Sequence, residues 1–233
     1  MDNDRWQSGF ILHIRPFSKG QLLLELFLEK LGRTSVIARA LKSWRPLLNL
    51  FSRLNFCYTS KASLARLTQL EADSGAPLAL VNFKGPRIAC AFYLNELIYR
   101  LLAPGDGAGR LFSSYQVTLT KLLDNSSPLE PALRSFEKVL LEEIGYGIDF
   151  KCASDHAPIK DWCYYNYLAR EGFKEVSANA SKEAYLGQVL AKIARQDWDL
   201  EALKAAKRLF RASLQPLLGP KPLASRKLLA SYS

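Results

Sequence analysis

Two segments of this chain carry many arginines and lysines and no carboxylate. The first lies between Glu29 and Glu71, and the second follows Glu201. Residues 1–70 hold 11 basic and 4 acidic residues and residues 202–233 hold 7 basic and no acidic ones, in a chain whose net charge is +10. Neutralising the phosphates of a nucleic acid takes many cations on one surface, so we expect a nucleic acid as partner. Solvated faces of an ordinary basic protein are the alternative.

Aromatic residues interleave with the cations of the first segment, a mixture typical of proteins that stack bases and follow the backbone of a single strand. Most of these rings should belong to a core, and Trp44, between Ser43 and Arg45, is the one we expect to be exposed. In the second segment the cations fall in one sector of a helix over residues 199–215, beside an apolar stripe. The residues predicted to contact the nucleic acid are Arg33, Arg39, Lys42, Trp44, Arg45, Arg53, Lys204, Lys207, Arg208, Arg211, Lys221 and Arg226.

Cys152, His156 and Cys163 have the types of side chain that bind metals, in the spacing C-x3-H-x6-C. Structural zinc usually has four ligands in two close pairs, and the sequence offers no second pair. We therefore predict no metal, two loop thiols and an exposed histidine. Cys57 and Cys90 lie inside apolar patterns and should be buried.

Catalytic motifs are missing from the sequence. It holds two histidines and contains no HExxH, no GxSxG elbow and no GxxxxGK[ST] phosphate loop. A metal-dependent nuclease would need a carboxylate cluster for Mg²⁺, which the basic ends lack. A peripheral membrane protein would need an amphipathic helix with exposed aromatics, which residues 199–215 satisfy only in part. A nucleic-acid-binding protein without catalytic turnover or cofactor is the main hypothesis, and these two classes stay as alternatives.

Short strands separated by turns dominate the first eighty residues. Residues 10–15 alternate with a period of two until Pro16, and a second run at 22–28 follows a turn at 18–20. Further strands are predicted at 34–37, 51–59 and 64–70. Five such strands suit a small closed barrel, and an oligonucleotide-binding (OB) barrel is the natural choice because closure removes exposed edges and leaves one face for a ligand.

From Pro86 the apolar period changes to that of helices. Helices are predicted from Pro86 to a glycine-rich break at 104–109, over 110–124, from a capping-box pattern at 127–130 to Gly145, and over 181–196 and 199–215. An irregular, aromatic segment at 146–173 separates the middle helices from the late ones. The predicted fold class is therefore α+β, with an OB barrel over residues 1–80 and a helical domain over 81–233 that ends in a basic helix.

The sequence predicts neither a membrane span nor a secretory signal. Its apolar runs are far shorter than the ~20 residues that cross a bilayer, and the N-terminus carries acids at Asp2 and Asp4. The four cysteines lack the spacing of a disulfide framework, which indicates reduced thiols. We expect a cytoplasmic protein.

Motifs spread over nearly the whole chain resemble the RecO family of bacterial recombination mediators. They are GFILH at 9–13, RPF at 15–17, GR at 32–33, YLNEL at 93–97, EPALR at 130–134, GYG at 145–147, AAKR at 205–208 and LGPKPL at 218–223. The resemblance implies an N-terminal OB domain and a helical C-terminal domain. It also implies binding of single- and double-stranded DNA near the nucleoid, annealing of complementary strands, and roles in DNA repair, DNA recombination and the DNA damage response.

The resemblance further implies protein partners. RecR would assist this chain in loading the RecA recombinase onto DNA coated by single-stranded-DNA-binding protein (SSB), in a pathway that also includes RecF. The acidic, apolar tail of SSB would dock on the helical domain, and we expect its receptor to include Leu133, Arg134 and Phe136, with the guanidinium meeting the terminal carboxylate. Some relatives carry a four-cysteine zinc module after the GYG motif, where this chain keeps Cys152 and Cys163.

Overall fold

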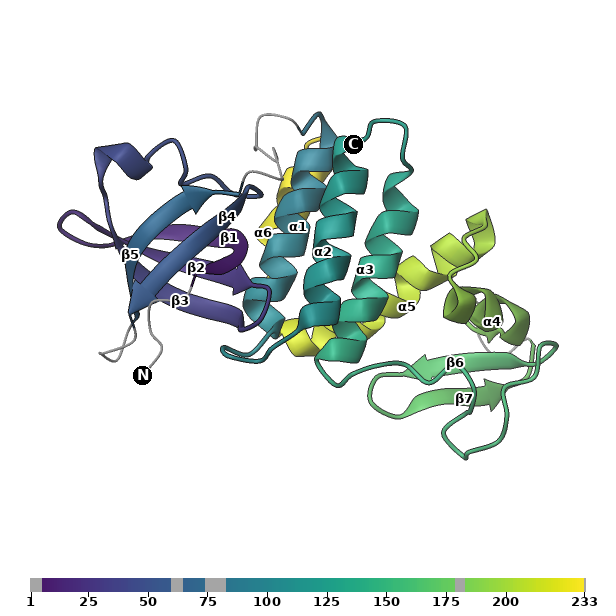
Figure 1. Cartoon of the computed structure of the whole chain (residues 1–233). Coiled ribbons are helices and arrows are strands. Elements are labelled where there is room, and N and C mark those ends of the chain that lie inside the picture. The colour runs from purple at the N-terminus through teal and green to yellow at the C-terminus, as the bar shows by residue number, and fades with distance from the viewer. Residues whose placement is uncertain (1–5, 60–64, 74–82, 179–182, 233) are drawn as a thin grey trace. The chain divides into compact units, whose positions relative to one another are not determined.

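A five-stranded barrel forms the N-terminal part of the structure, a computed structural model that describes residues 6–59, 65–73, 83–178 and 183–232. Its strands are β1 (Gln7–Ser18), β2 (Gln21–Leu28), β3 (Gly32–Arg39), β4 (Arg53–Thr59) and β5 (Ala65–Ala72). They close in the order β1-β2-β3-β5-β4, with β3 and β5 parallel and the other pairs antiparallel (Figure 1). The predicted OB-type barrel and the α+β class are confirmed.

Alternating apolar side chains fill the barrel, as strands with one inward face require. Leu24 and Leu26 of β2, Val36 of β3 and Phe56 of β4 belong to this core. Strand β2 departs from strict alternation because residues 23–28 are all buried. Phe27, on its second face, packs against aromatic rings outside the barrel, which explains why the run LLLELFL is apolar except at Glu25.

Helices α1 (Pro86–Leu101), α2 (Gly109–Leu123) and α6 (Ala224–Ala230) form one compact unit with the barrel, which spans residues 1–127 and 222–233. Phe10 and Phe27 of the barrel contact Phe112 and Tyr115 of α2, with ring centroids 5.1–5.8 Å apart. The Tyr115 hydroxyl donates to Asn95 at 2.6 Å. The rings and this hydrogen bond are buried, and they join the barrel to α1 and α2.

Gly32 lets the start of β3 approach the connection between α1 and α2. Its φ is 64°, and a Cβ there would lie 1.7 Å from the carbonyl oxygen of Asp106. A residue with a side chain would clash and would strain the backbone, so the glycine at this turn is a packing requirement.

The N-terminus of α6 is held by a carboxylate from α1. Glu96 accepts hydrogen bonds from the backbone N–H groups of Ala224 and Ser225 and from the Ser225 hydroxyl, at 2.7–2.9 Å. Partial burial raises the pKa of Glu96, but these bonds and the nearby Arg100 outweigh it and leave the pKa below its usual value. The ionised carboxylate therefore fastens α6 to α1.

Replacing Glu96 with glutamine should destabilise the protein by about 1–2 kcal/mol, the usual contribution of a helix cap. Because the folded-state pKa is lowered, the carboxylate contributes fully above the ordinary pKa and its contribution is lost as the pH falls through the folded value. Thermal melts of wild type and Glu96→Gln should differ most at neutral pH and converge in acid. An equal difference at every pH would contradict this assignment.

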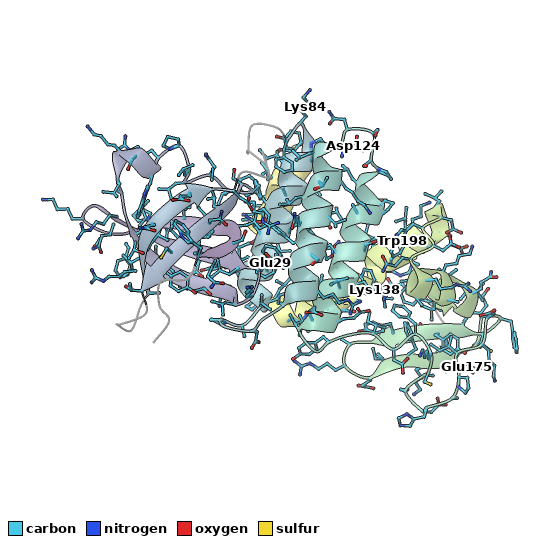
Figure 2. The ribbon with its side chains drawn as sticks, viewed as in Figure 1. Glu29, Lys84, Asp124, Lys138, Glu175 and Trp198 are labelled. Carbon is cyan, nitrogen blue, oxygen red and sulfur yellow. The ribbon has the colours of Figure 1, made fainter. Side chains whose placement is uncertain are left out.

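A second compact unit spans residues 128–221. It contains α3 (Leu129–Glu143), the strands β6 (Tyr164–Leu168), β7 (Gly172–Val176) and β8 (Tyr185–Leu186), α4 (Gly187–Arg195) and α5 (Leu200–Leu218). The strands form one antiparallel sheet in the order β7-β6-β8. Trp198 ties the chain before α5 to α3, since its indole N–H donates to the Ser135 hydroxyl at 3.2 Å (Figure 2).

Several predicted elements need correction. The segment at 146–173 is not wholly irregular, because β6 and the start of β7 lie in it. The helix predicted over 181–196 begins at Gly187, and residues 185–186 are strand. The capping box is wrong, since Pro128 caps α3 without a side-chain bond while the Ser127 hydroxyl donates to Asp124. The boundary expected at 80/81 and the starts expected at 64 and 181 lie outside the described residues.

Within the described ranges, no helix has the length and apolar character needed to cross a membrane.

Candidate nucleic-acid interface

A hollow of about 320 Å³ opens on the outer surface of the barrel. It is bordered by β3, β5, the end of β4, the start of β2 and the 3-10 helix η1 (Lys42–Trp44). Its lining brings together two cations, one indole and several small polar groups, namely Arg39, Arg66, Trp44, Gln21, Thr59 and Thr68. These are the donor and stacking groups that single-strand binders use.

The strand register explains why the two arginines share this face. Ile37 of β3 is the Cα partner of Arg66 of β5. Arg39 lies two residues beyond Ile37, and side chains two apart on a strand point to the same side. Val36 and Ala38 point into the core, so the side that carries Arg39 and Arg66 faces outward.

Both guanidinium groups are available to a ligand. Arg39 and Arg66 are exposed, and in the described part of the chain no carboxylate pairs with either. Arg39 was predicted from the sequence, whereas Arg66 was not included among the predicted contacts. The signal for it was present, because Arg66 and Thr68 alternate with apolar residues in the strand pattern.

Trp44 is half-buried and packs against the barrel core. The expectation of an exposed indole is therefore wrong. The residue sits at the end of η1, where its carbonyl accepts from the N–H groups of Leu47 and Leu48 at 2.9 Å. The side chain packs against the core and also lines the hollow, so part of Trp44 lies beside the two arginines. Lys42 and Arg45 flank it and are exposed.

Arg33 and Arg53 have a different environment from the other predicted contacts. Arg33 pairs with the buried Glu25 at 3.1 Å and donates to the Leu102 carbonyl at 2.9 Å. Arg53 pairs with Glu29 and Asp73, each at 3.0 Å, and Glu29 is labelled in Figure 2. Because these ion pairs occupy both guanidinium groups, we leave Arg33 and Arg53 out of the interface proposed below.

The basic residues of α5 lie on its exposed side. Lys204 and Arg211 have no ion-pair partner among the described residues. Lys207 pairs with Glu130 at 2.9 Å, but both groups are largely exposed and such pairs contribute little. Arg208 donates to the Tyr185 hydroxyl at 3.1 Å and stacks over that ring at 4.3 Å. We call Lys204, Lys207, Arg208 and Arg211 the α5 ridge.

The two remaining predicted cations belong to different units. Lys221 is exposed at the end of the second unit, and Arg226 is half-buried on α6 in the first.

The burial of the cysteines and of His156 in the structure tests the predictions made for these side chains. Cys57 and Cys90 are buried as free cysteines, and His156 is exposed, as predicted. Among the described residues, no group of three or more metal-ligating side chains comes together. Burial and the neighbouring Glu175 raise the pKa of the Cys163 thiol, which disfavours the thiolate that would bind a metal or act as a nucleophile.

The segment predicted to receive a peptide tail is largely inside the second unit. Leu133 and Arg134 are each 7% exposed and Phe136 is fully buried. Arg134 pairs with the buried Glu137, with its Nη1 2.8 Å from Oε2. Its Nε is buried and has no hydrogen-bond partner within the described structure.

Comparisons with known proteins agree with the motifs. The family model described as "Recombination protein O C terminal" matches residues 83–227. A protein of Tolumonas auensis named "DNA repair protein RecO" is 39% identical over 96% of this chain and 94% of its own length. Proteins with the same name from Coxiella burnetii and Pasteurella multocida are 39% and 36% identical, over 96% and 98% of this chain and 96% of their own lengths.

Proposed function

This chain belongs to the RecO family of DNA repair proteins, and from that premise we propose that it binds single-stranded DNA on the outer face of its barrel. Arg39 and Arg66 would contact phosphates, and the exposed part of Trp44 would stack on a base. Lys42 and Arg45 lie next to Trp44 in the chain and would extend the contact along the backbone.

The single observation that carries this proposal is the hollow in which two arginines, without a carboxylate partner among the described residues, meet an aromatic side chain. Phosphate neutralisation supplies most of the affinity for a single strand, and stacking of bases on aromatic rings adds binding free energy with little dependence on the base sequence. The α5 ridge offers a second basic surface for another strand or for duplex DNA.

We propose further that the protein anneals complementary strands and, with RecR, helps to load RecA onto DNA coated by SSB, in a pathway shared with RecF. It would act in the cytoplasm at the DNA as a mediator without catalytic turnover. Two basic surfaces on one chain can screen the repulsion between two phosphate backbones, and this requires no bound nucleotide. We propose that the SSB tail docks at Leu133, Arg134 and Phe136; because these side chains are buried, docking would require this part of α3 to open, and a terminal carboxylate would then satisfy the unpartnered Nε of Arg134.

The purified chain should anneal complementary oligonucleotides in the presence of a chelator and without ATP. The measurement is the rate of duplex formation above the spontaneous rate, followed by fluorescence quenching of paired labels. The same reactions are examined on a denaturing gel after Mg²⁺ is added, since cleavage would support the nuclease alternative. Pelleting with anionic liposomes tests the membrane alternative. Annealing that required ATP hydrolysis by the chain would overturn the proposed mechanism.

A further inference from the structure

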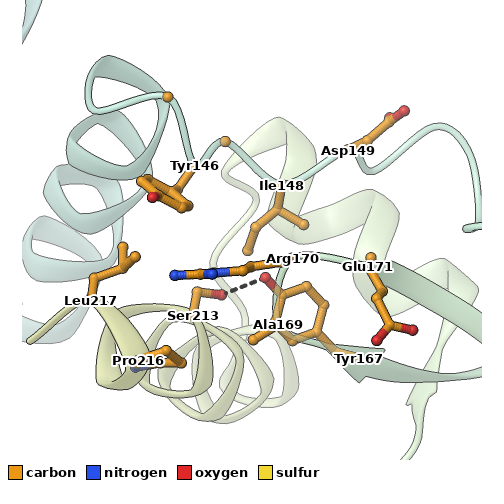
Figure 3. Close-up of a pocket in the computed structure, with 13 residues that line it drawn as sticks. Tyr146, Ile148, Asp149, Tyr167, Ala169, Arg170, Glu171, Ser213, Pro216 and Leu217 are labelled. Carbon is orange, nitrogen blue, oxygen red and sulfur yellow. Dashed lines mark hydrogen bonds between the residues drawn. The ribbon is translucent and has the colours of Figure 1, made fainter. Parts of the chain in front are cut away.

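A second hollow, of about 470 Å³, lies within the second unit, apart from the residues assigned above. It is formed by the chain that follows α3, by the turn between β6 and β7, and by the C-terminal end of α5. Figure 3 shows Tyr146 on one side, the Arg170 side chain across the middle, and Ser213, Pro216 and Leu217 of α5 on the other. Its volume is in the range of sites that hold small organic ligands.

Arg170 is held in an unusual backbone conformation. Its φ is 73°, a left-handed value that is uncommon for a bulky residue and costs free energy. The side chain reaches into the hollow (Figure 3), and within the described structure it has no hydrogen-bond or ion-pair partner. A guanidinium presents five N–H donors in a planar fork that matches phosphate and carboxylate oxygens. An anion is therefore the expected occupant next to Arg170.

The other walls suit a flat, partly apolar group. Tyr146 is 43% exposed, and Leu217 and Ile148 supply aliphatic surface. The hydroxyls of Ser213 and Tyr167 form a hydrogen bond at 2.9 Å, and this bond joins α5 to β6 and fixes one wall.

The two carboxylates at the rim are directed away from the guanidinium. Asp149 accepts from the backbone N–H of Lys151 at 2.7 Å, which holds its carboxylate in its own turn. Asp149 and Glu171 both point away from the Arg170 guanidinium in Figure 3.

We propose that this hollow holds one nucleotide of a single strand, with its base against Tyr146 and its phosphate on Arg170. The inference rests on the proposed function and extends it to a second, separate contact. The exposed Tyr146 and the aliphatic walls beside the Arg170 guanidinium suit a base together with its phosphate. This combination favours a nucleotide over an isolated peptide terminus.

Two variants separate the stacking contact from the phosphate contact, with a labelled oligothymidylate as the probe and the full chain as the protein. Tyr146→Ala should weaken binding about tenfold and leave the salt dependence unchanged, because stacking involves no counterion. Arg170→Asn should also weaken binding about tenfold and should lower the slope of log affinity against log salt by about 0.7. Arg195→Asn is the matched control, since Arg195 is exposed at the end of α4 and outside both the hollow and the ridge.

Folding is monitored in the same series. Asparagine adopts the left-handed conformation more readily than arginine, so Arg170→Asn should melt at a temperature no lower than wild type. A loss of affinity without a loss of stability therefore reports the contact itself.

Three results would overturn the inference. If both variants bind the oligonucleotide as wild type does while Arg39→Glu/Arg66→Glu binds weakly, this hollow is not a DNA contact and the barrel interface stands. If the variants lose binding of a labelled acidic peptide and keep that of the oligonucleotide, the hollow is a peptide site. If no variant, the barrel variant included, alters DNA binding, the proposed function falls together with the inference.

Discussion

Arg39→Glu/Arg66→Glu is expected to bind single-stranded DNA at least about 100-fold more weakly than wild type. Each arginine is exposed beside Trp44 and has no carboxylate partner among the described residues. A hydrogen bond to a charged group contributes about 1.5–3 kcal/mol, so two lost contacts correspond to about 3–6 kcal/mol, or at least two orders of magnitude. The reversed charges would add repulsion to this loss.

Fluorescence anisotropy with a labelled oligothymidylate, at several salt concentrations, measures the effect. Loss of two phosphate contacts should lower the slope of log affinity against log salt by roughly 1.4. The matched control is Lys84→Glu/Lys121→Glu, which makes the same change in net charge at two exposed lysines of the first unit; Lys84 is labelled in Figure 2. An equal loss in the control would mean that net charge, and not the hollow, determines binding.

Arg134→Glu should destabilise the second unit by about 3–5 kcal/mol. The substitution places a second carboxylate beside the buried Glu137, which Arg134 now neutralises at 2.8 Å. Removing one partner of a buried ion pair leaves an uncompensated buried charge, and this charge is the reason for the loss of stability. A fall in melting temperature of roughly 6–20 °C should accompany it.

This expected instability changes how the tail site is tested. Loss of peptide binding by Arg134→Glu would report unfolding as readily as a missing contact. Arg134→Met/Glu137→Leu removes both charges and keeps apolar volume, and such exchanges are often neutral or stabilising. The double variant should melt closer to wild type than Arg134→Glu does, keep binding DNA, and lose binding of an acidic tail peptide. Wild-type affinity for the peptide in the double variant would exclude Arg134 from the tail site.

The barrel was predictable from the sequence because its strands obey local rules. Residues 10–15 alternate with a period of two, and glycine or proline marks the turns, so strand positions follow from patterns a few residues long. The parallel pairing of β3 with β5 was not predictable, since it joins residues about thirty positions apart. That pairing brings Arg66 to Arg39, which explains why Arg66 was missed.

The incorrect predictions for the second unit and for the paired arginines have a similar physical origin. The tyrosines of β6 alternate weakly with polar residues, and the sheet is tied to α5 by contacts between residues far apart in the sequence, such as the Tyr167–Ser213 hydrogen bond. In the sequence Arg33, Arg53 and Arg134 looked like free cations. In the structure Arg33 pairs with Glu25, Arg53 pairs with Glu29 and Asp73, and Arg134 pairs with Glu137. Except for the Arg134–Glu137 pair, these contacts depend on tertiary structure, and no local pattern predicts them.

Mapping the crosslinks of a photoreactive single strand tests the central claim most directly. An oligothymidylate that contains iododeoxyuridine is bound to the full chain, irradiated and digested, and the crosslinked peptides are identified by mass spectrometry. The account predicts a crosslink at Trp44, because a base stacked on the indole beside Arg39 and Arg66 would hold the reactive carbon against that ring. Crosslinks confined to other parts of the chain, with Trp44 unmodified under conditions of saturated binding, would contradict it.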